Sequence, residues 1–314
     1  MYKLIRFFNQ NRKKIIRTML FIVLIILIIN LLNNNIKNKN ENNYVETVTT
    51  DNTFDEVISN KSAVSGESIS NSKLKKDTDI IKEFVGYCNE QDINSAYSIL
   101  TDECKEEMFP TIEDFNNIYY EKLFNGNKKQ YTIENWNGNI YQVRITEDIL
   151  ASGKINDSST KQDYITVVNK NGEKKLNINN YVGRKNADKT TEMKDIKMTI
   201  TSIDTYMDYE IYNLTIENNS DNTILLDVGG NPKSVYLLDS KQMKYYFYGN
   251  EIVENKLMIE SKFKNTIKIK FNNSYSSSRE IEKLVFSKLV LNYEEYKNIE
   301  NKEEYDFYKF NVNV

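Results

Sequence analysis

One stretch decides the fold expected for the middle of the chain: Phe84-Val-Gly-Tyr-Cys-Asn-Glu-Gln-Asp-Ile-Asn-Ser-Ala-Tyr-Ser-Ile-Leu100. Its apolar residues recur three and four positions apart on both sides of a polar turn at residues 90–92. This spacing is the period of an α-helix. The pattern therefore predicts two helices joined by a short turn, and Ile80 and Ile81 extend the first of them.

The residues that follow predict a third helix and then a sheet. Thr111 is suited to cap the helix, and Asp114 stands at the capping-box position. Asn-Gly pairs at 137–138 and 171–172 fall in turns between strand-like runs, a strong hairpin signal. Helices followed by an antiparallel meander predict an α+β domain with helices on one sheet face. The runs cover residues 130–136, 140–150, 164–170 and 174–181.

Residues 77–186 resemble a domain of the nuclear-transport-factor-two-like superfamily, in which a bent sheet wraps around helices as a cone. The resemblance rests on the quoted stretch with its Ala96-Tyr97-x-x-Leu100, and on the closing strand Leu176-Asn-Ile-Asn-Asn-Tyr-Val-Gly-Arg184. It implies either an enzyme with Asp, His or Tyr inside the cone, or a non-catalytic module of the kind found outside the membrane in conjugation and secretion machines. No catalytic motif of the family transfers to residues of this chain.

Residues 190–314 show a period of two, as in Ile196, Met198 and Ile200, with turn clusters between short runs. Many short alternating strands predict a β-sandwich. This segment resembles the immunoglobulin-like domains of Gram-positive exported proteins, although it lacks the disulfide and central Trp of antibody domains. The resemblance implies a spacer or a docking module. It is carried by Leu214-Thr-Ile-Glu-Asn-Asn-Ser220, Thr223-Ile-Leu-Leu226 and Thr266-Ile-Lys-Ile-Lys-Phe271.

An apolar run at residues 15–32 predicts a transmembrane helix. It is free of charge except for Arg17 near its start, and its length is close to the minimum that spans a bilayer. The alternatives are a buried soluble helix, which would usually carry a polar stripe, and a cleaved signal peptide, which would need small residues after the run. An uncleaved signal anchor is favoured over both.

The flanks of this run predict its orientation. Residues 1–32 hold six positive side chains and no acid, so the tail 1–14 should be cytoplasmic and the rest of the chain extracytoplasmic. Residues 33–76 are rich in Asn, Lys, Ser and acid and show no periodicity, so they are expected to form a disordered linker. The predicted class is thus a multidomain protein of the cell membrane: anchor, α+β cone and immunoglobulin-like sandwich.

Composition excludes several functional classes. Without the six basic residues of the anchor segment, 36 Lys and Arg stand against 45 Asp and Glu, a net charge of −9. Such a body should not bind nucleic acid, which requires neutralising phosphates. The chain has no histidine, which excludes Ser-His-Asp and Cys-His nucleophiles and His-containing zinc sites. Two cysteines and the absence of a phosphate-binding glycine motif leave neither a metal site nor a cofactor site to predict.

Two groups of residues remain as candidate sites. Cys88 and Cys104 could form a disulfide, because the expected compartment is oxidising, or could be buried thiols. A reactive thiol is the third alternative. Tyr245, Tyr246, Phe247 and Tyr248 could form a partner-binding surface, or could alternate between core and half-exposed strand positions.

The first module is not expected to hold a catalytic centre. Its charged residues are spread along the strands, as in Glu134, Arg144, Glu147 and Asp163, and no two carboxylates are forced together. We therefore expect a cone interior lined by apolar and aromatic residues. The predicted function is that of a non-enzymatic, single-pass envelope protein with a protein partner. A sensor that binds a ligand in the cone, or a cone-type enzyme, are the alternatives, and the oligomeric state is open.

Overall fold

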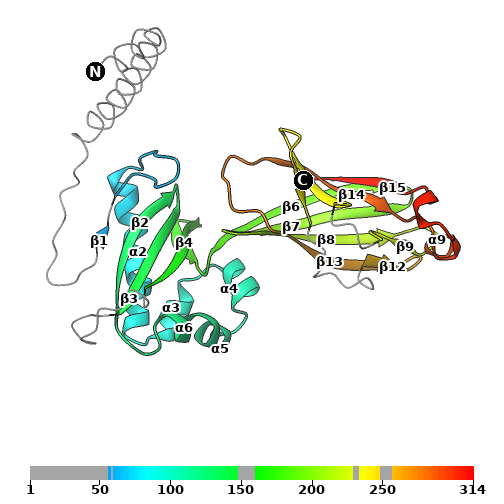
Figure 1. Ribbon diagram of the computed structural model, residues 1–314. Coiled ribbons are helices and arrows are strands. Elements are labelled where there is room, and N and C mark those ends of the chain that lie inside the picture. The colour runs from blue at the N-terminus through cyan, green and yellow to red at the C-terminus, as the bar shows by residue number, and fades with distance from the viewer. Residues whose placement is uncertain (1–55, 58, 148–159, 229–232, 248–256) are drawn as a thin grey trace, which may run out of the picture. The chain divides into compact units, whose positions relative to one another are not determined.

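The computed structural model describes residues 56–57, 59–147, 160–228, 233–247 and 257–314 (Figure 1). Within these ranges the protein consists mostly of antiparallel β-sheet with short helices, which confirms that part of the predicted class. The tail 1–14, the expected transmembrane helix 15–32 and most of the expected linker lie outside the described residues. No helix within the described ranges is long and apolar enough to cross a membrane.

Helices α2 to α6 form one layer of the first module. They comprise α2 (Asn71–Asn89), α3 (Ile93–Ser98), α4 (Asp102–Met108), α5 (Ile112–Phe115), the π-helical η1 (Asn116–Tyr120) and α6 (Glu121–Leu123). The side chains of Ser70, Asp92 and Thr101 accept hydrogen bonds at the starts of α2, α3 and α4, as N-caps do. The predicted capping box of Thr111 and Asp114 is confirmed at the start of α5.

A five-stranded sheet forms the other layer, in the order β1-β2-β3-β4-β5. Its strands are β1 (Glu56–Val57), β2 (Lys129–Asn137), β3 (Ile140–Glu147), β4 (Lys161–Lys170) and β5 (Glu173–Asn177). The short β1 pairs with β2 in parallel, and the successive pairs from β2 to β5 are antiparallel. Both predicted Asn-Gly turns are confirmed: Gly138 lies between β2 and β3, and Asn171 and Gly172 adopt the positive φ of 54° and 89° that a tight hairpin requires.

Aromatic side chains fill the space between these two layers. Phe84, Phe109, Phe115 and Tyr119 are at most 1% exposed and pack ring against ring, with centroid separations of 5.6–6.4 Å. Such ring pairs prefer tilted or edge-on contacts, and most of these are of that kind. The interior of the first module is therefore a packed aromatic core.

Two four-stranded sheets enclose the second core, in the orders β13-β8-β7-β6 and β11-β10-β14-β15. A third pair, β12 with β9, is short. The strands are β6 (Tyr181–Met193), β7 (Ile196–Tyr206), β8 (Glu210–Asn218), β9 (Ile224–Leu225), β10 (Val235–Asp239), β11 (Lys244–Tyr246), β12 (Met258–Ile259), β13 (Lys264–Phe271), β14 (Ile281–Leu289) and β15 (Tyr308–Asn313). Helices α9 (Tyr293–Asn298) and η3 (Lys302–Glu304) stand between β14 and β15.

Several element boundaries differ from the expected ones. The run expected at 174–181 is divided between β5, which ends at Asn177, and β6, which begins at Tyr181. Helix α2 begins at Asn71, inside the segment expected to be linker. The sequence did not reveal this start because the first turn of the helix is polar and shows no apolar periodicity. Strand β6 runs unbroken from Tyr181 to Met193, across the expected junction at 186–190. Most of β6 is polar and half-exposed or exposed, as suits the edge position that it holds in its sheet, so hydrophobic alternation does not reveal it.

Candidate functional site

A buried carboxylate on α2 organises the most polar part of the first module. The side chain of Asp77 is 1% exposed. It accepts hydrogen bonds from the Tyr141 hydroxyl on β3 at 2.8 Å and from the Lys73 ammonium one helical turn earlier at 2.6 Å. The Lys174 ammonium on β5 donates to its other oxygen. Lys73 also donates to the carbonyl of Gly138 at 3.1 Å, which joins α2 to the β2–β3 turn.

These contacts determine the ionisation of Asp77. Burial by itself would raise its pKa, because a carboxylate loses hydration in the interior. Hydrogen bonds from Lys174, Lys73 and Tyr141 outweigh burial, and the pKa of Asp77 is lowered below its ordinary value. The carboxylate is therefore ionised at neutral pH, and it holds two ammonium groups in place.

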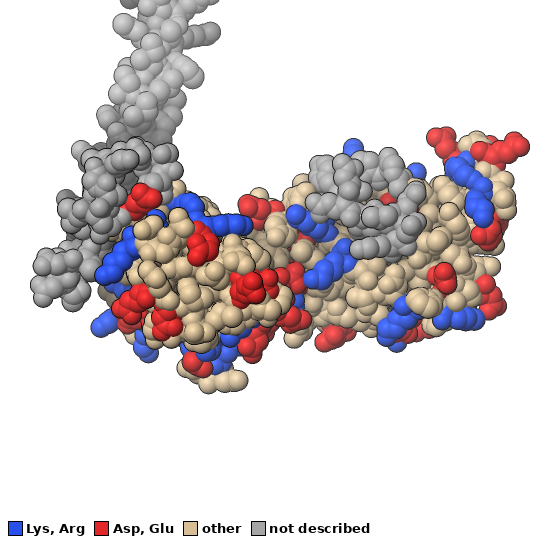
Figure 2. Space-filling view, turned by 90° about the horizontal axis from the view of Figure 1, so that it is seen from below, with Lys and Arg blue, Asp and Glu red and all other residues tan. Residues whose placement is uncertain are grey.

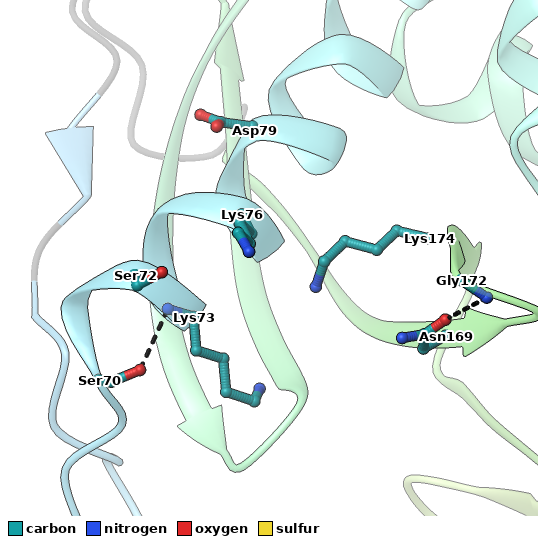
Figure 3. A pocket seen from close by; sticks show the side chains of 8 residues that line it. All are labelled: Ser70, Ser72, Lys73, Lys76, Asp79, Asn169, Gly172 and Lys174. Carbon is teal, nitrogen blue, oxygen red and sulfur yellow. Dashed lines mark hydrogen bonds between the residues drawn. The ribbon is translucent and has the colours of Figure 1, made fainter.

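The two lysines border an open depression of about 580 Å³ (Figure 3). The Lys174 side chain extends from β5 toward α2, and Asp79 points away from the lysines. Asn169, the cross-strand neighbour of Lys174, accepts a hydrogen bond from the Gly172 N–H at 3.0 Å. The depression thus presents fixed positive charge over an ionised buried acid. It is lined by Ser70, Ser72, Lys73, Lys76, Asp79, Asn169, Gly172 and Lys174.

A second buried carboxylate, Asp163, lies within the aromatic core and has only neutral partners. It accepts from the Tyr119 hydroxyl at 2.7 Å and from the N–H groups of Asn179 and Asn180 at 2.9 Å each. Burial raises the pKa of Asp163, and these hydrogen bonds offset the rise only in part. The pKa of Tyr119 is raised well above its ordinary value, first by burial and then by the adjacent carboxylate. This pair braces the turn after β5, in which both Asn residues have positive φ.

The other charged residues singled out in the sequence lie in ordinary surface contacts. Arg144 approaches Glu134 at 3.5 Å and donates to Gln142 at 2.8 Å. Glu147 lies 3.6 Å from the ammonium of Lys129. On the face in Figure 2, acidic and basic side chains are interspersed rather than gathered by sign. The Arg144 and Glu147 side chains are exposed in these pairs, whereas the Lys129 side chain is 8% exposed.

The two cysteines are free thiols buried in the first core. Cys88 is 1% exposed and Cys104 is fully buried. Burial raises the pKa of both thiols, which disfavours the reactive thiolate. The two thiols are not joined in the structure, and both pack among core residues.

The described part of the aromatic run at 245–248 contributes to the second core through Phe247 and, at its edge, Tyr245. Phe247 is buried in the second core, whereas Tyr245 and Tyr246 are half-buried, and Tyr248 lies outside the described residues. The Tyr245 hydroxyl donates to Asp239 at 3.0 Å, and Tyr246 packs edge-on against Tyr236 at 5.8 Å. The exposed apolar residue of this strand region is Met243, 58% exposed just before β11.

Sequence reasoning missed a charged cluster where the two cores meet. Arg184 on β6 bonds to Asp204 on β7 at 2.8 Å and to Glu106 and Glu107 of α4 at 2.8 and 3.3 Å. Glu107 also pairs with Lys268 of β13 at 3.0 Å. Neither this cluster nor the Asp77 cluster follows a recognised motif. The spacing of Lys73 and Asp77, four residues apart on a helix, was the one available signal.

Comparisons with known proteins add little to this geometry. No protein-family model and no curated protein matches the chain. The crystal structure of the yjhA protein from Bacillus subtilis is similar over 40% of this chain and 94% of that one, with 14% sequence identity and a TM-score of 0.27. A similarity of that size carries no argument about this chain. Within the described residues, no group of three Cys, Asp or Glu side chains is placed to hold a metal ion.

Proposed function

We propose that this protein is a non-enzymatic, single-pass component of a cell envelope that presents two extracytoplasmic modules for binding or assembling other proteins. In this proposal the first module is a cone of the nuclear-transport-factor-two-like type, and the second is an immunoglobulin-like sandwich. The layered order of helices and meander supports the former. The two sheets around one core support the latter.

The packed interior of the first module carries this proposal. A cone that binds a ligand or catalyses a reaction needs an open cavity, because small-molecule sites are concave clefts with a mostly apolar lining and a few well-placed polar groups. Here Phe84, Phe109, Phe115 and Tyr119 occupy that volume. The carboxylate within it, Asp163, is committed to a hydroxyl and two backbone N–H groups. A filled interior leaves the outer surface as the functional part, which is the property of a scaffold.

The sensor and the enzyme remain as alternative proposals with defined requirements. A sensor would need the aromatic core to open for an apolar ligand. An enzyme would need a second titratable side chain beside Asp163, and the Tyr119 hydroxyl is a poor proton donor because its pKa is raised. The filled core and the raised pKa of Tyr119 favour the scaffold over both alternatives.

Site-specific photo-crosslinking in intact cells tests the proposal. The crosslinking amino acid would replace Met243 beside the aromatic run, and Phe263 before β13 provides a matched control, since the two are 58% and 57% exposed. Ile118, on η1, samples the first module. A discrete adduct of one mass from Met243 or Ile118, with none from Phe263, is the expected result. If no position forms an adduct, the scaffold proposal fails.

Protease accessibility tests the topology on which the proposal depends. In cells stripped of wall, external protease should degrade everything after residue 33 and leave the basic tail and the apolar run 15–32. Survival of the two modules under these conditions would overturn the extracytoplasmic location.

A further inference from the structure

The depression beside Asp77 has a chemistry that scaffolding does not use. Two ammonium groups are bound to the two oxygens of one buried carboxylate, so their nitrogens lie no more than about 8 Å apart. Lys73 is held a second time by the Gly138 carbonyl. The side chains of Lys73 and Lys174 are nevertheless 43% and 29% exposed. The ammonium groups are therefore fixed from below and open to solvent from the depression.

The remaining lining adds donors and one more positive charge. Lys76 is exposed on the same side of α2. The oxygen of the Asn169 side chain accepts from the Gly172 N–H, so the NH₂ group of Asn169 is the donor that this residue offers to a ligand in the depression. Ser72 contributes a hydroxyl. Counting Asp77 and Asp79 against three lysines, the lining keeps a net charge of +1, in a chain whose body is otherwise acidic.

From this arrangement we infer that the depression between α2 and the β4–β5 hairpin binds a phosphate group. Phosphate oxygens can bridge two ammonium groups at this separation, and lysine acts toward phosphate as a point charge. Asp77 is the positioning residue: it touches the lysines and not the anion. The group could belong to free phosphate or to the headgroup of a phospholipid, and the same lysines would recognise both. This inference is independent of the proposed function.

Two lysines of one helix provide a matched pair of variants. Lys76 lines the depression, whereas Lys75 is exposed on the same helix outside it. Lys76→Gln and Lys75→Gln remove the same charge, and neither side chain contacts the buried Asp77. Lys174→Gln addresses the clamp directly, but it leaves Asp77 with fewer partners, so its fold must be checked by thermal melting. If the Lys174→Gln protein is unstable, the comparison of Lys76→Gln with Lys75→Gln still tests the site.

The first arm titrates the full chain, in a neutral phosphate-free detergent, with inorganic phosphate by calorimetry. Saturable binding is expected, weakened about three- to fivefold by Lys76→Gln and about tenfold by Lys174→Gln, with little change for Lys75→Gln. The second arm places the full chain in nanodiscs of phosphatidylcholine with or without phosphatidylglycerol, and measures hydrogen exchange over residues 70–76.

The pattern of outcomes identifies the source or rejects the site. Phosphate binding with the expected variant order supports the site and assigns it to free phosphate. Protection that appears only with phosphatidylglycerol, and is lost in Lys76→Gln but not Lys75→Gln, supports the site and assigns it to a lipid headgroup. If the wild type binds in neither arm, or if Lys76→Gln and Lys75→Gln behave alike, the inference is overturned.

Discussion

The two buried carboxylates of the first module, Asp77 and Asp163, are stabilised by different kinds of partner. Asp163 is surrounded by neutral donors deep in the aromatic core, whereas Asp77 is neutralised by two lysines whose ends reach water. The pKa of Asp163 is raised and that of Asp77 is lowered. The difference teaches that burial alone does not define a site. Asp163 is sealed inside the fold, and Asp77 connects the fold to its surface.

The largest expected effect concerns how firmly the core around Asp163 is closed. Cys88 and Cys104 lie in the same core, so they should react with a thiol reagent only when that core opens. We expect labelling in the native protein to be at least about a thousandfold slower than in urea. Timed labelling with a chromogenic disulfide measures this. Fast native labelling would mean that the core opens readily, and absence of labelling in urea without reductant would mean a disulfide.

Removal of the sealed carboxylate should come next in size. Asp163→Ala leaves the buried Tyr119 hydroxyl and two partly buried backbone N–H groups without their acceptor, at a cost of about 3 kcal/mol in the free energy of unfolding. Tyr119→Phe removes one of the three donors and should cost about 1 kcal/mol. Urea denaturation measures both. Equal losses would show that the tyrosine, and not the turn, is what the carboxylate stabilises.

Removal of the connecting carboxylate should cost less. After Asp77→Asn, the ammonium groups of Lys73 and Lys174 can turn to water, because both side chains are partly exposed. We expect a loss of about 1.5 kcal/mol, since solvent screens these pairs. A loss as large as that of Asp163→Ala would break the distinction between the two carboxylates. The same urea titration decides this.

The smallest expected effect is a difference in pH dependence. The lowered pKa of Asp77 means that its stabilising contribution is present above the ordinary value of 3.8 and is lost as the pH falls through the folded pKa. The raised pKa of Asp163 means that its contribution is fully present below 3.8 and is lost as the pH rises through the folded pKa. The difference in the free energy of unfolding between wild type and Asp77→Asn should therefore become smaller as the pH is lowered.

The difference in the free energy of unfolding between wild type and Asp163→Asn should become larger as the pH is lowered. For each variant, this difference should change by about 1 kcal/mol or less between pH 6 and pH 4. Denaturation curves at several pH values for the three proteins measure these slopes. Slopes of the same sign for both variants would contradict the opposite shifts.

The sequence predicted what depends on periodicity and turn chemistry. Thr111 and Asp114 predicted a capping box, and Asn171-Gly172 predicted a hairpin. Both predictions succeeded because each motif consists of residues suited to one local backbone geometry. The part of β6 beyond Arg184 was missed because most of its residues are polar. Hydrophobic periodicity predicts an element when one of its faces is buried. It does not predict an element when neither face is buried.

The candidate site could not be predicted for a different reason. Asp77, Tyr141 and Lys174 come from α2, β3 and β5, and they meet only after the hairpins fold against the helix. A single sequence holds no record of such distant pairs. The Asp163 side chain was singled out as a strand residue, but its partners in the turn at 179–180 were equally invisible.

Strand β6 also bears on how this chain could be recombined with others. Tyr181 belongs to the first core, while the strand goes on to pair with β7 as far as Met193, and Tyr206 of β7 packs back on the first core. Arg184 joins both sides through three carboxylates. A crossover at residues 186–190 would divide the β6–β7 ladder, whose register shifts between Asn186 and Lys189, and would separate Asp204 from Arg184. Exchange of the two modules as cassettes therefore requires that β6, β7 and α4 be inherited together.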